Sequence, residues 1–347
     1  EAQEKLRELN NVDTYTDWRK LLDRPDLDLV AVATRPATHA EIATACLEAG
    51  KAVLLEKPPA IDLAAAEGLA EVRDQTGTVI GVDLIMRFNP LLIALRRLSR
   101  AGVFGRLRRV DVENYAQDEQ LPPGHWFWEP AQSGGILIEH GIHFFDLVHF
   151  LQPAAVLSVT GLKHDRQPGQ EDQVLANVLY EGGLLATHYH SFARPGFFEK
   201  TTIKLAYDLA DLELHGWIPL RAEVSALVGA GTKATLLAEP LFSLTAATPV
   251  AQAADESRPE GWGDPAGNED GRRAIHSGGV RYEVSEMLTG VLDLDRSKQS
   301  VYQDCVRTSL LDVLKRLDDP SHLLTAPLEA GLTALKVAVG ATEGTRR

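Results

Sequence analysis

The segment from Gly134 to Asp146 holds the side chains best suited to proton transfer in this chain of 347 residues. On a helix, Glu139, His143 and Asp146 recur at i, i+4 and i+7, so they form one stripe on one face. A carboxylate one turn from an imidazole can orient that ring and raise its basicity, as a proton shuttle requires. Most other positions of the segment are apolar, so the helix is expected to be buried. The pattern therefore favours a functional site over a solvated polar stripe.

A lysine follows an earlier strand candidate. Lys57 comes directly after the apolar run 52–55 and Glu56, and Pro58-Pro59 behind it fix the local backbone. In open parallel sheets, ligands bind at the carboxyl ends of the strands. We therefore expect the ammonium of Lys57 to be held at such an edge, with a surface lysine in a proline-rich turn as the alternative.

Two further histidines raise a metal alternative. His188 and His190 alternate on the strand candidate 184–191, so they share one face of a sheet. With His143 and Glu139 they could bind a metal ion through imidazole and carboxylate groups, and a metal-dependent lyase or isomerase would be the matching enzyme. Their spacing carries no ligand signature. A half-polar sheet face is the simpler interpretation.

Other motifs receive plain structural interpretations. Residues 229–234 match G-x-G-x-x-A, but Pro240 leaves little room for the helix that a dinucleotide turn needs, so a loop is expected. His140 and His149 project from other faces of the 134–151 helix and are expected to serve in packing or hydrogen bonding. The aromatic run 124–128 could stack on a sugar-like ligand or could pack internally, and both readings stay open.

The elements that would position these groups follow two different patterns along the chain. Apolar strand candidates at 29–33, 52–55 and 79–82 alternate with amphipathic helix patterns at 38–49 and 63–76, which is the rhythm of a parallel sheet. After a helix at 91–100, the chain continues with a series of strand candidates at 107–114, 156–163, 174–180, 184–191 and 201–207. These favour a largely antiparallel or mixed open sheet in an α+β domain. Residues 246–280 lack periodicity and predict a long loop, and helices are expected at 301–317 and 328–339. The predicted domains of this α/β protein are residues 1–89 and 90–347.

Composition excludes several partners. The net charge of -14 would repel a nucleic acid backbone. No run of 18 apolar residues is present, so no membrane association is expected. Cys46 and Cys305 are the only cysteines and lie in helix-like apolar patterns, which favours a reducing, cytoplasmic compartment.

Taken in order, these motifs resemble those of the Gfo/Idh/MocA family of oxidoreductases. The resemblance rests on residues 30–34 with His39, on Glu56-Lys57-Pro58, on residues 87–90 and on the 134–146 segment, and it spans nearly the whole chain. It implies an N-terminal Rossmann domain that binds NAD or NADP. It also implies a C-terminal α/β domain whose sheet lines the pocket for a sugar, polyol or cyclitol substrate and mediates assembly into a homo-oligomer.

The resemblance implies roles for individual residues. The motif lysine of the family falls on Lys57, its acidic residue on Glu139 and its catalytic histidine on His143. In the family these groups bind the reacting hydroxyl and exchange its proton, while hydride passes to or from nicotinamide. Further positions would border the cofactor, with the last also near the substrate: Thr34, Pro36, His39, Glu56, Lys57 and Arg87.

Two departures from the family pattern bear on these roles. The acidic residue of the family is usually Asp, and Glu139 is one methylene longer, so it could reach a different hydroxyl or only orient His143. In addition, no strand, glycine-rich turn and helix precede Glu1, so the first βαβ unit of the Rossmann domain is expected to be absent. The favoured reason is that the chain is a fragment of a longer protein, because Glu1–Leu9 looks like the helix that follows that unit. True loss of the unit is the alternative.

The leading hypothesis is a dehydrogenase that transfers hydride between NAD(P) and a sugar, polyol or cyclitol. His143 would be the general acid and base, Lys57 its electrostatic and proton partner, and Glu139 the group that orients the imidazole. No metal site is assigned in this hypothesis. The metal-dependent enzyme and a non-catalytic binding protein that has lost its cofactor site are the alternatives.

Overall fold

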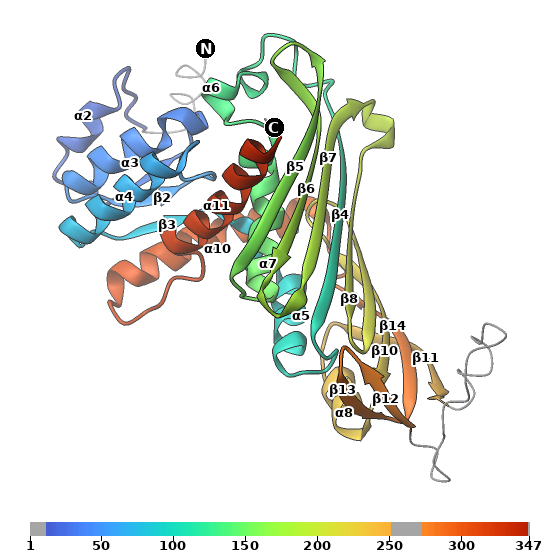
Figure 1. Ribbon diagram of the computed structural model, residues 1–347. Coiled ribbons are helices and arrows are strands. Elements are labelled where there is room, and N and C mark those ends of the chain that lie inside the picture. Colours follow the sequence, from blue (N-terminus) through green and yellow to red (C-terminus); the bar gives the residue numbers. More distant parts are fainter. Residues whose placement is uncertain (1–11, 251–272, 346–347) are drawn as a thin grey trace.

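In the computed structural model, which describes residues 12–250 and 273–345, a three-stranded parallel sheet occupies the N-terminal part (Figure 1). The strands are β1 (Leu29–Val32), β2 (Ala52–Leu55) and β3 (Ile80–Val82), in the order β1-β2-β3. All four residues of β2 are buried, as expected for the central strand of a parallel sheet covered on both faces. The predicted parallel pattern is confirmed.

Short-range capping sets the helix ends in this part of the chain. The carboxylate of Asp62 accepts the backbone N–H of Ala65 at 2.8 Å, and Gly77 ends the same helix with a positive φ of 68°. Pro90 starts the next helix, where Asn89 caps the N–H of Leu91. The helical segments up to residue 100 are α2 (Arg19–Leu22), η1 (Pro36–Thr38), α3 (His39–Glu48), α4 (Leu63–Thr76), η2 (Ile85–Phe88) and α5 (Pro90–Arg100).

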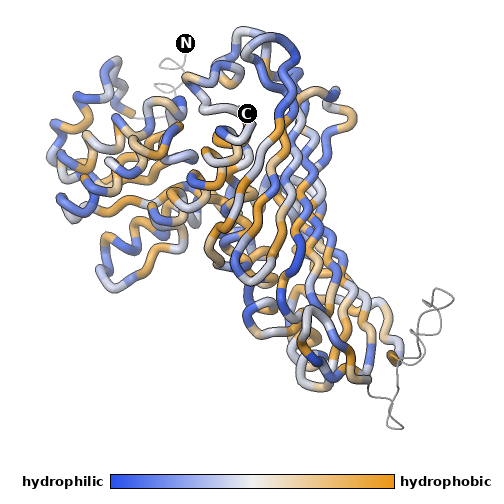
Figure 2. Tube along the Cα trace, in the orientation of Figure 1, coloured by the Kyte–Doolittle hydropathy of each residue, from blue (hydrophilic) through white to orange (hydrophobic). Residues whose placement is uncertain are grey.

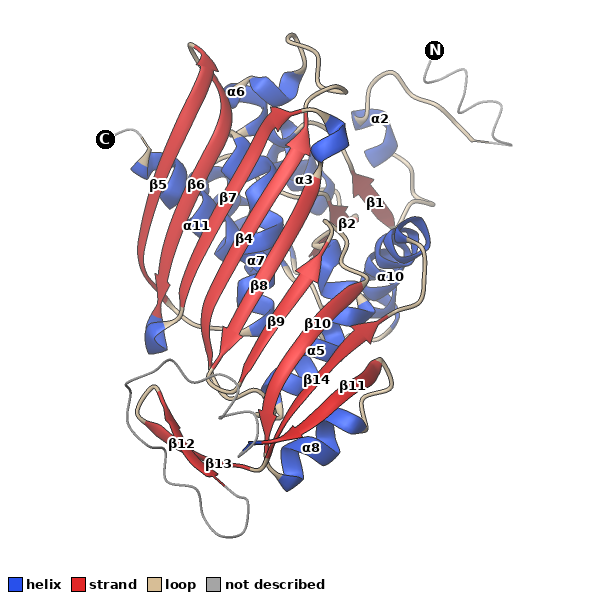
Figure 3. Ribbon diagram, turned by 90° about the vertical axis from the view of Figure 1, so that its right-hand side faces the viewer, coloured by secondary structure: helices blue, strands red, loops and turns tan. Residues whose placement is uncertain are grey.

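A nine-stranded mixed sheet forms the larger part of the molecule (Figure 3). Its order is β11-β14-β10-β9-β8-β4-β7-β6-β5, and only the β4–β7 pair is parallel within the described residues. This confirms the predicted largely antiparallel or mixed sheet. The strands in chain order are β4 (Leu107–Gln117), β5 (Val156–Gln167), β6 (Gln170–Tyr180), β7 (Leu185–Arg194), β8 (Lys200–Tyr207), β9 (Ala210–His215), β10 (Arg221–Val228), β11 (Phe242–Pro249) and β14 (Glu286–Asp293).

Helices cover one face of the large sheet. They are α5, α7 (Ile142–Leu151) and α11 (Leu328–Gly344), and their apolar side chains share a core with inward residues of the strands. Figure 2 shows hydrophobic positions, coloured orange, along these helices and strands. In β10, Ala222, Val224, Ala226 and Val228 alternate as the buried set, as the two-residue period of a strand requires. No helix of the described residues covers the opposite face (Figure 3). Shorter helical segments connect the strands: η3 (Trp126–Trp128), α6 (Pro130–Ser133), η4 (Leu137–Gly141), η5 (Glu181–Gly183) and η6 (Gly196–Phe198).

The end of the chain returns to the small sheet. Helix α10 (Lys298–Asp318) places Val301 and Cys305 in the same apolar cluster as Val53 and Leu55 of β2. Leu328 of α11 joins that cluster. The domain boundary between residues 89 and 90 stays a prediction, but the core around β1–β3 includes residues from both sides of it. Among the described helices, none has both the length and the apolar composition needed to cross a membrane.

The predicted loop over 246–280 is wrong at both ends. Residues up to Pro249 belong to β11, which pairs with β14, and β12 (Arg273–Ser277) and β13 (Val280–Val284) form a hairpin. Asp208 anchors that hairpin by accepting hydrogen bonds from Ser277 and Tyr282. β11 is an exposed edge strand, and its last four residues, 246–249, show no apolar alternation. Residues 251–272 lie outside the described part, as does the helix predicted for Glu1–Leu9.

The loop predicted at 229–234 is also wrong. Helix α8 (Ala230–Leu237) begins there, with Thr232 bonding back to the backbone of Gly229. The preceding strand β10 lies in an antiparallel arrangement between β9 and β14. A dinucleotide turn needs a parallel strand, so the glycine motif here is a helix start of another kind.

Candidate active site

The segment predicted as the site helix starts with an unusual cap. Gly135 has a φ of +96°, and a Cβ at this residue would lie 2.6 Å from Oε1 of Glu171 on β6. That carboxylate accepts the backbone N–H of Ile136, where the helix begins. Glycine is needed because both the backbone conformation and the close carboxylate exclude a side chain. The cap sets the position of η4, a π-helical turn, and of α7, in which every residue is buried.

Lys57 and Glu139 join the two halves of the chain. Lys57 lies at the carboxyl edge of the small sheet, and its Nζ donates to Oε1 of Glu139 at 2.6 Å and to the backbone oxygen of Glu139 at 2.8 Å. Each side chain is 14% exposed, so the ion pair is largely shielded from water. The structure therefore brings together two groups that are 82 residues apart in the sequence.

His143 lies one turn beyond this pair and lines the same cavity. Burial lowers its pKa well below the usual 6.5, and the positive charge of Lys57 acts in the same direction. The ring is therefore neutral near pH 7 and can accept a proton. Among the described residues, nothing bonds Nδ1 of His143. The carboxylate of Glu139 accepts a hydrogen bond from the ammonium of Lys57, and its expected role of orienting His143 stays a prediction.

Arg87 and Asp146 form a separate buried ion pair. Nε and Nη2 of Arg87 donate to the Asp146 carboxylate, and Nη1 donates to the backbone oxygen of Thr325. Asp146 is 1% exposed, and burial raises its pKa while Arg87 opposes that rise. Arg87 is not among the described residues that line the cavity, because its cation neutralises the buried carboxylate of Asp146. The expectation that it borders nicotinamide and substrate stays a prediction. Of the predicted polar stripe, Glu139 and His143 line the cavity, whereas Asp146 does not.

The cavity between the two sheets has a volume of about 510 Å³. Seven of the residues proposed from the sequence line this cavity. Five come from the segments that follow β1 and β2 in the chain, and two come from the 134–151 segment: Thr34, Pro36, His39, Glu56, Lys57, Glu139 and His143. His39 holds the two loops together, since its ring nitrogens lie 2.7 Å from the oxygen of Pro58 and 3.0 Å from that of Thr34.

Several residues of the cavity wall were missed by sequence reasoning or interpreted differently: Asp83, His140, Trp217, Tyr302 and, among the open alternatives, Trp126. Asp83 follows β3 as Thr34 follows β1, so the strand-end rule would have found it. Burial raises the pKa of Asp83 to about 6, and its Oδ1 is buried without a partner among the described residues. Trp217 and Tyr302 come from distant elements and carry no local signal.

The metal alternative is not supported by the geometry. His188 and His190 are fully buried on the helix-covered face of the large sheet, where their rings pack against Phe145 and Phe144. Within residues 12–250 and 273–345, no group of three or more histidine, cysteine or acidic side chains is placed to hold a metal ion. His140, expected to serve in packing or hydrogen bonding, does both, since its Nε2 lies 2.9 Å from Oδ1 of Asn114 and its ring packs against Phe144. The ring also lines the cavity.

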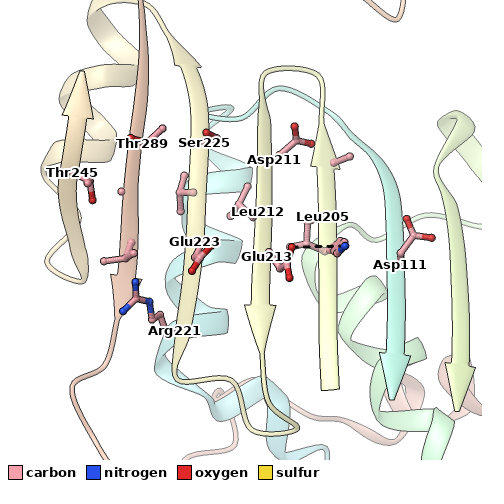
Figure 4. A pocket seen from close by; sticks show the side chains of 15 residues that line it. Asp111, Leu205, Asp211, Leu212, Glu213, Arg221, Glu223, Ser225, Thr245 and Thr289 are labelled. Carbon is pink, nitrogen blue, oxygen red and sulfur yellow. Dashed lines mark ion pairs between the residues drawn. The ribbon is translucent and has the colours of Figure 1, made fainter. Parts of the chain in front are cut away.

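A second hollow of about 630 Å³ lies on the uncovered face of the large sheet (Figure 4). Acidic side chains of β9 and β10, among them Asp211, Glu213 and Glu223, project into it together with Arg221. No histidine or cysteine is among its described lining residues. Since its walls come from a single sheet face, it offers no pair of opposed groups for chemistry.

The fold is of the α/β type, with a Rossmann-like parallel sheet beside a larger mixed sheet and a cavity at the carboxyl edge of the small sheet. The model of the GFO/IDH/MocA oxidoreductase family, NAD-binding Rossmann fold, matches residues 1–84, and that of the GFO/IDH/MocA C-terminal domain matches residues 92–206. The chain belongs to the Gfo/Idh/MocA family.

Relatives of known activity are similar over part of their length. Scyllo-inositol 2-dehydrogenase (NAD+) of Bacillus subtilis is 28% identical over 52% of this chain and 54% of its own. Bovine trans-1,2-dihydrobenzene-1,2-diol dehydrogenase is 32% identical over 49% and 50%. The chain thus spans about half the length of the curated relatives it matches.

A solved structure shares the fold over nearly the whole chain. The WlbA dehydrogenase from Bordetella pertussis, crystallised with NADH and UDP-GlcNAcA, superposes with a TM-score of 0.72. It covers 99% of this chain and 85% of its own at 16% identity.

Proposed function

We propose that this protein transfers hydride between NAD or NADP and a hydroxyl or carbonyl group of a sugar, polyol or cyclitol. The observation that carries the proposal is the Lys57–Glu139 ion pair in one cavity with a neutral His143. An ammonium beside the reacting oxygen and an imidazole able to take its proton are the groups that alcohol oxidation needs. Family membership and the activities of the relatives support the same reaction class.

The residues of the cavity fit a nicotinamide cofactor. Thr34, Pro36, His39 and Glu56 lie at the carboxyl edge of the parallel sheet, where dinucleotides bind in this type of fold. A carboxylate such as Glu56 can accept hydrogen bonds from ribose hydroxyls. The unpartnered Oδ1 of Asp83 is an acceptor that suits an amide N–H of the cofactor. Arg87 stays a proposed neighbour of the cofactor, although it does not line the cavity.

The side chains divide the work of the reaction. During oxidation, His143 accepts the hydroxyl proton at its cavity-facing nitrogen, and Lys57 stabilises the negative charge that grows on the oxygen. Glu139 fixes the ammonium of Lys57 at 2.6 Å. The bound nicotinamide supplies the hydride acceptor for oxidation and the hydride donor for reduction. In reduction, His143 returns the proton to the new hydroxyl.

The wall of the cavity supports a cyclic polyhydroxylated substrate. Trp217 packs against His143 at a ring-centroid distance of 5.5 Å and against Tyr302 at 5.9 Å, and Trp126 lies on the same cavity. Aromatic faces of this kind suit the C–H faces of a sugar or cyclitol ring, while the nearby acidic groups suit its hydroxyls.

We further propose a cytoplasmic homo-oligomer that assembles through the uncovered face of the large sheet. That face carries charges of both signs, such as Glu213 paired with Lys204 at 3.8 Å and the neighbouring Arg221 (Figure 4). A self-complementary pattern of this kind suits a symmetric contact between copies. Cys46 and Cys305, both buried free thiols, support a reducing compartment.

The proposal is tested with the variants Lys57→Met and His143→Asn. Wild-type protein is expected to bind NADH or NADPH in a fluorescence titration and to oxidise at least one of scyllo-inositol and trans-1,2-dihydrobenzene-1,2-diol. Each variant should retain nucleotide binding but lose roughly 100-fold or more in kcat. Lys336→Met, an exposed lysine change on α11, is the matched control. Undiminished turnover in both site variants would refute the assignment.

A further inference from the structure

His140 lies beside His143 in the cavity wall, a position that the residue pattern alone did not predict. It lies in the π-helical turn η4, three residues before His143, and the two ring centroids are 6.4 Å apart at an interplanar angle of 78°. Turns of this type often occur at functional sites. The proposed reaction uses only His143, so the second imidazole is left without a role.

Hydrogen bonding fixes which nitrogen of His140 carries the proton. Nε2 lies 2.9 Å from Oδ1 of Asn114, whose amide nitrogen donates to Oγ1 of Thr201 at 2.7 Å. An amide oxygen only accepts, so Nε2 must be the N–H donor, and Nδ1 keeps a free lone pair in the neutral ring. Asn114 is 2% exposed, so this arrangement is held inside the protein.

Packing and electrostatics keep the ring in place and uncharged. The rings of His190 and Phe192 contact His140 edge-on at centroid distances of 5.4 and 5.2 Å. Burial, aided by the positive charge of Lys57, lowers the pKa of His140 to about 3. At neutral pH, the ring is therefore an acceptor next to the reacting groups.

We propose that His140 is a specificity-determining residue, accepting a hydrogen bond from the hydroxyl on the carbon next to the reacting carbon. The cavity would thereby select vicinal diols and the corresponding hydroxyketones. This inference rests on the proposed function, and it identifies the neighbouring hydroxyl as the substrate group that His140 binds. Oxygens on adjacent carbons lie about 3 Å apart and each hydrogen bond adds about 2.8 Å, so two rings 6.4 Å apart can each take one of them.

The test uses trans-1,2-cyclohexanediol and cyclohexanol, which differ only in the neighbouring hydroxyl. Wild-type protein is expected to favour the diol in kcat/KM by about tenfold, the effect of one hydrogen bond. In His140→Phe, this preference should fall to about one. Thr201→Val keeps His140 but removes the partner that orients Asn114, and it should reduce the preference partially.

His149→Phe is the matched control, because it makes the same change on the same helix where the ring packs against Tyr180. It should keep the wild-type preference. An unchanged preference in His140→Phe, with NADH binding intact, would overturn the inference alone. If His140→Phe does not fold, an unchanged preference in Thr201→Val decides against it. No nicotinamide-dependent turnover of any polyol by wild-type protein would overturn the proposed function and this inference together.

Discussion

At the scale of single residues, charges in this protein are paired according to burial. Lys57 and Glu139 line the cavity, whereas Arg87 and Asp146 are not among its lining residues. An unpaired carboxylate destabilises the folded state far more when it is buried than when it is exposed. The guanidinium of Arg87 therefore stabilises the fold by pairing with Asp146. The two ion pairs therefore have different consequences when they are broken.

Arg87→Met should lower the free energy of unfolding by about 3–5 kcal/mol, because it leaves Asp146 buried without its partner. The measurement is urea unfolding at pH 7. The double variant Arg87→Met/Asp146→Leu should recover much of the loss, since no charge is then left unpaired. Arg109→Met, which breaks an exposed pair with Asp111, should cost less than about 1 kcal/mol. Equal losses in Arg87→Met and Arg109→Met would contradict this account.

At the scale of elements, the site helix is positioned from its N-terminus. The Glu171 carboxylate of β6 caps Ile136, and Gly135 makes room for it. Glu139, His140 and His143 follow within two turns. The start of one helix thus sets the location of the groups that face the small sheet.

Two glycine substitutions test this role with opposite signs. Gly135→Ala should lower the free energy of unfolding by about 2–4 kcal/mol, because φ is +96° and the new Cβ would meet Glu171 at 2.6 Å. Gly68→Ala lies inside helix α4 with nothing within 4 Å of the new Cβ, and it should stabilise by about 0.5–1 kcal/mol. Thermal unfolding of both variants checks the signs. A harmless Gly135→Ala would show that the cap does not constrain the helix.

At the scale of the whole molecule, the cavity exists because the chain crosses between two sheets and comes back. The ammonium of Lys57 comes from the small sheet and the imidazoles from the helix on the large one, while α10 returns to add Tyr302 to the wall (Figure 1). A group of neutral histidines is buried between the large sheet and the helical segment 137–151 that packs on it. Burial lowers the pKa of five of them: His140, His143, His149, His188 and His190.

These histidines should make the fold sensitive to acid. Below pH 6.5, an unfolded histidine binds a proton while its buried counterpart stays neutral, so stability falls as pH falls, by about 1.4 kcal/mol per pH unit for each such residue. His188→Phe removes one of them outside the cavity. Its free energy of unfolding should therefore decline less steeply than that of wild type between pH 6.5 and 5. Urea unfolding at several pH values measures both slopes, and parallel curves would contradict the prediction.

The sequence by itself determined most elements and one side of the site. Strands β1 to β3 and helices α3 and α4 were predicted within a residue or so, because apolar period and capping residues act locally. Lys57 could be assigned to a strand end for the same reason. Helix α8 was missed because Pro240 leaves little room after the glycine motif, and the end of β11 was missed because residues 246–249 show no apolar alternation.

Only the tertiary structure decided which groups meet. Lys57 and Glu139 are 82 positions apart and Arg87 and Asp146 are 59 positions apart, so the sequence carries no record of either pairing. The pairing depends on how two sheets and their helices pack. The same holds for Trp217 and Tyr302, and for the bond to Asn114 that turns His140 into an acceptor. Local periodicity acts over a few residues, whereas the burial that selects charge and hydrogen-bond partners is a property of the assembled core.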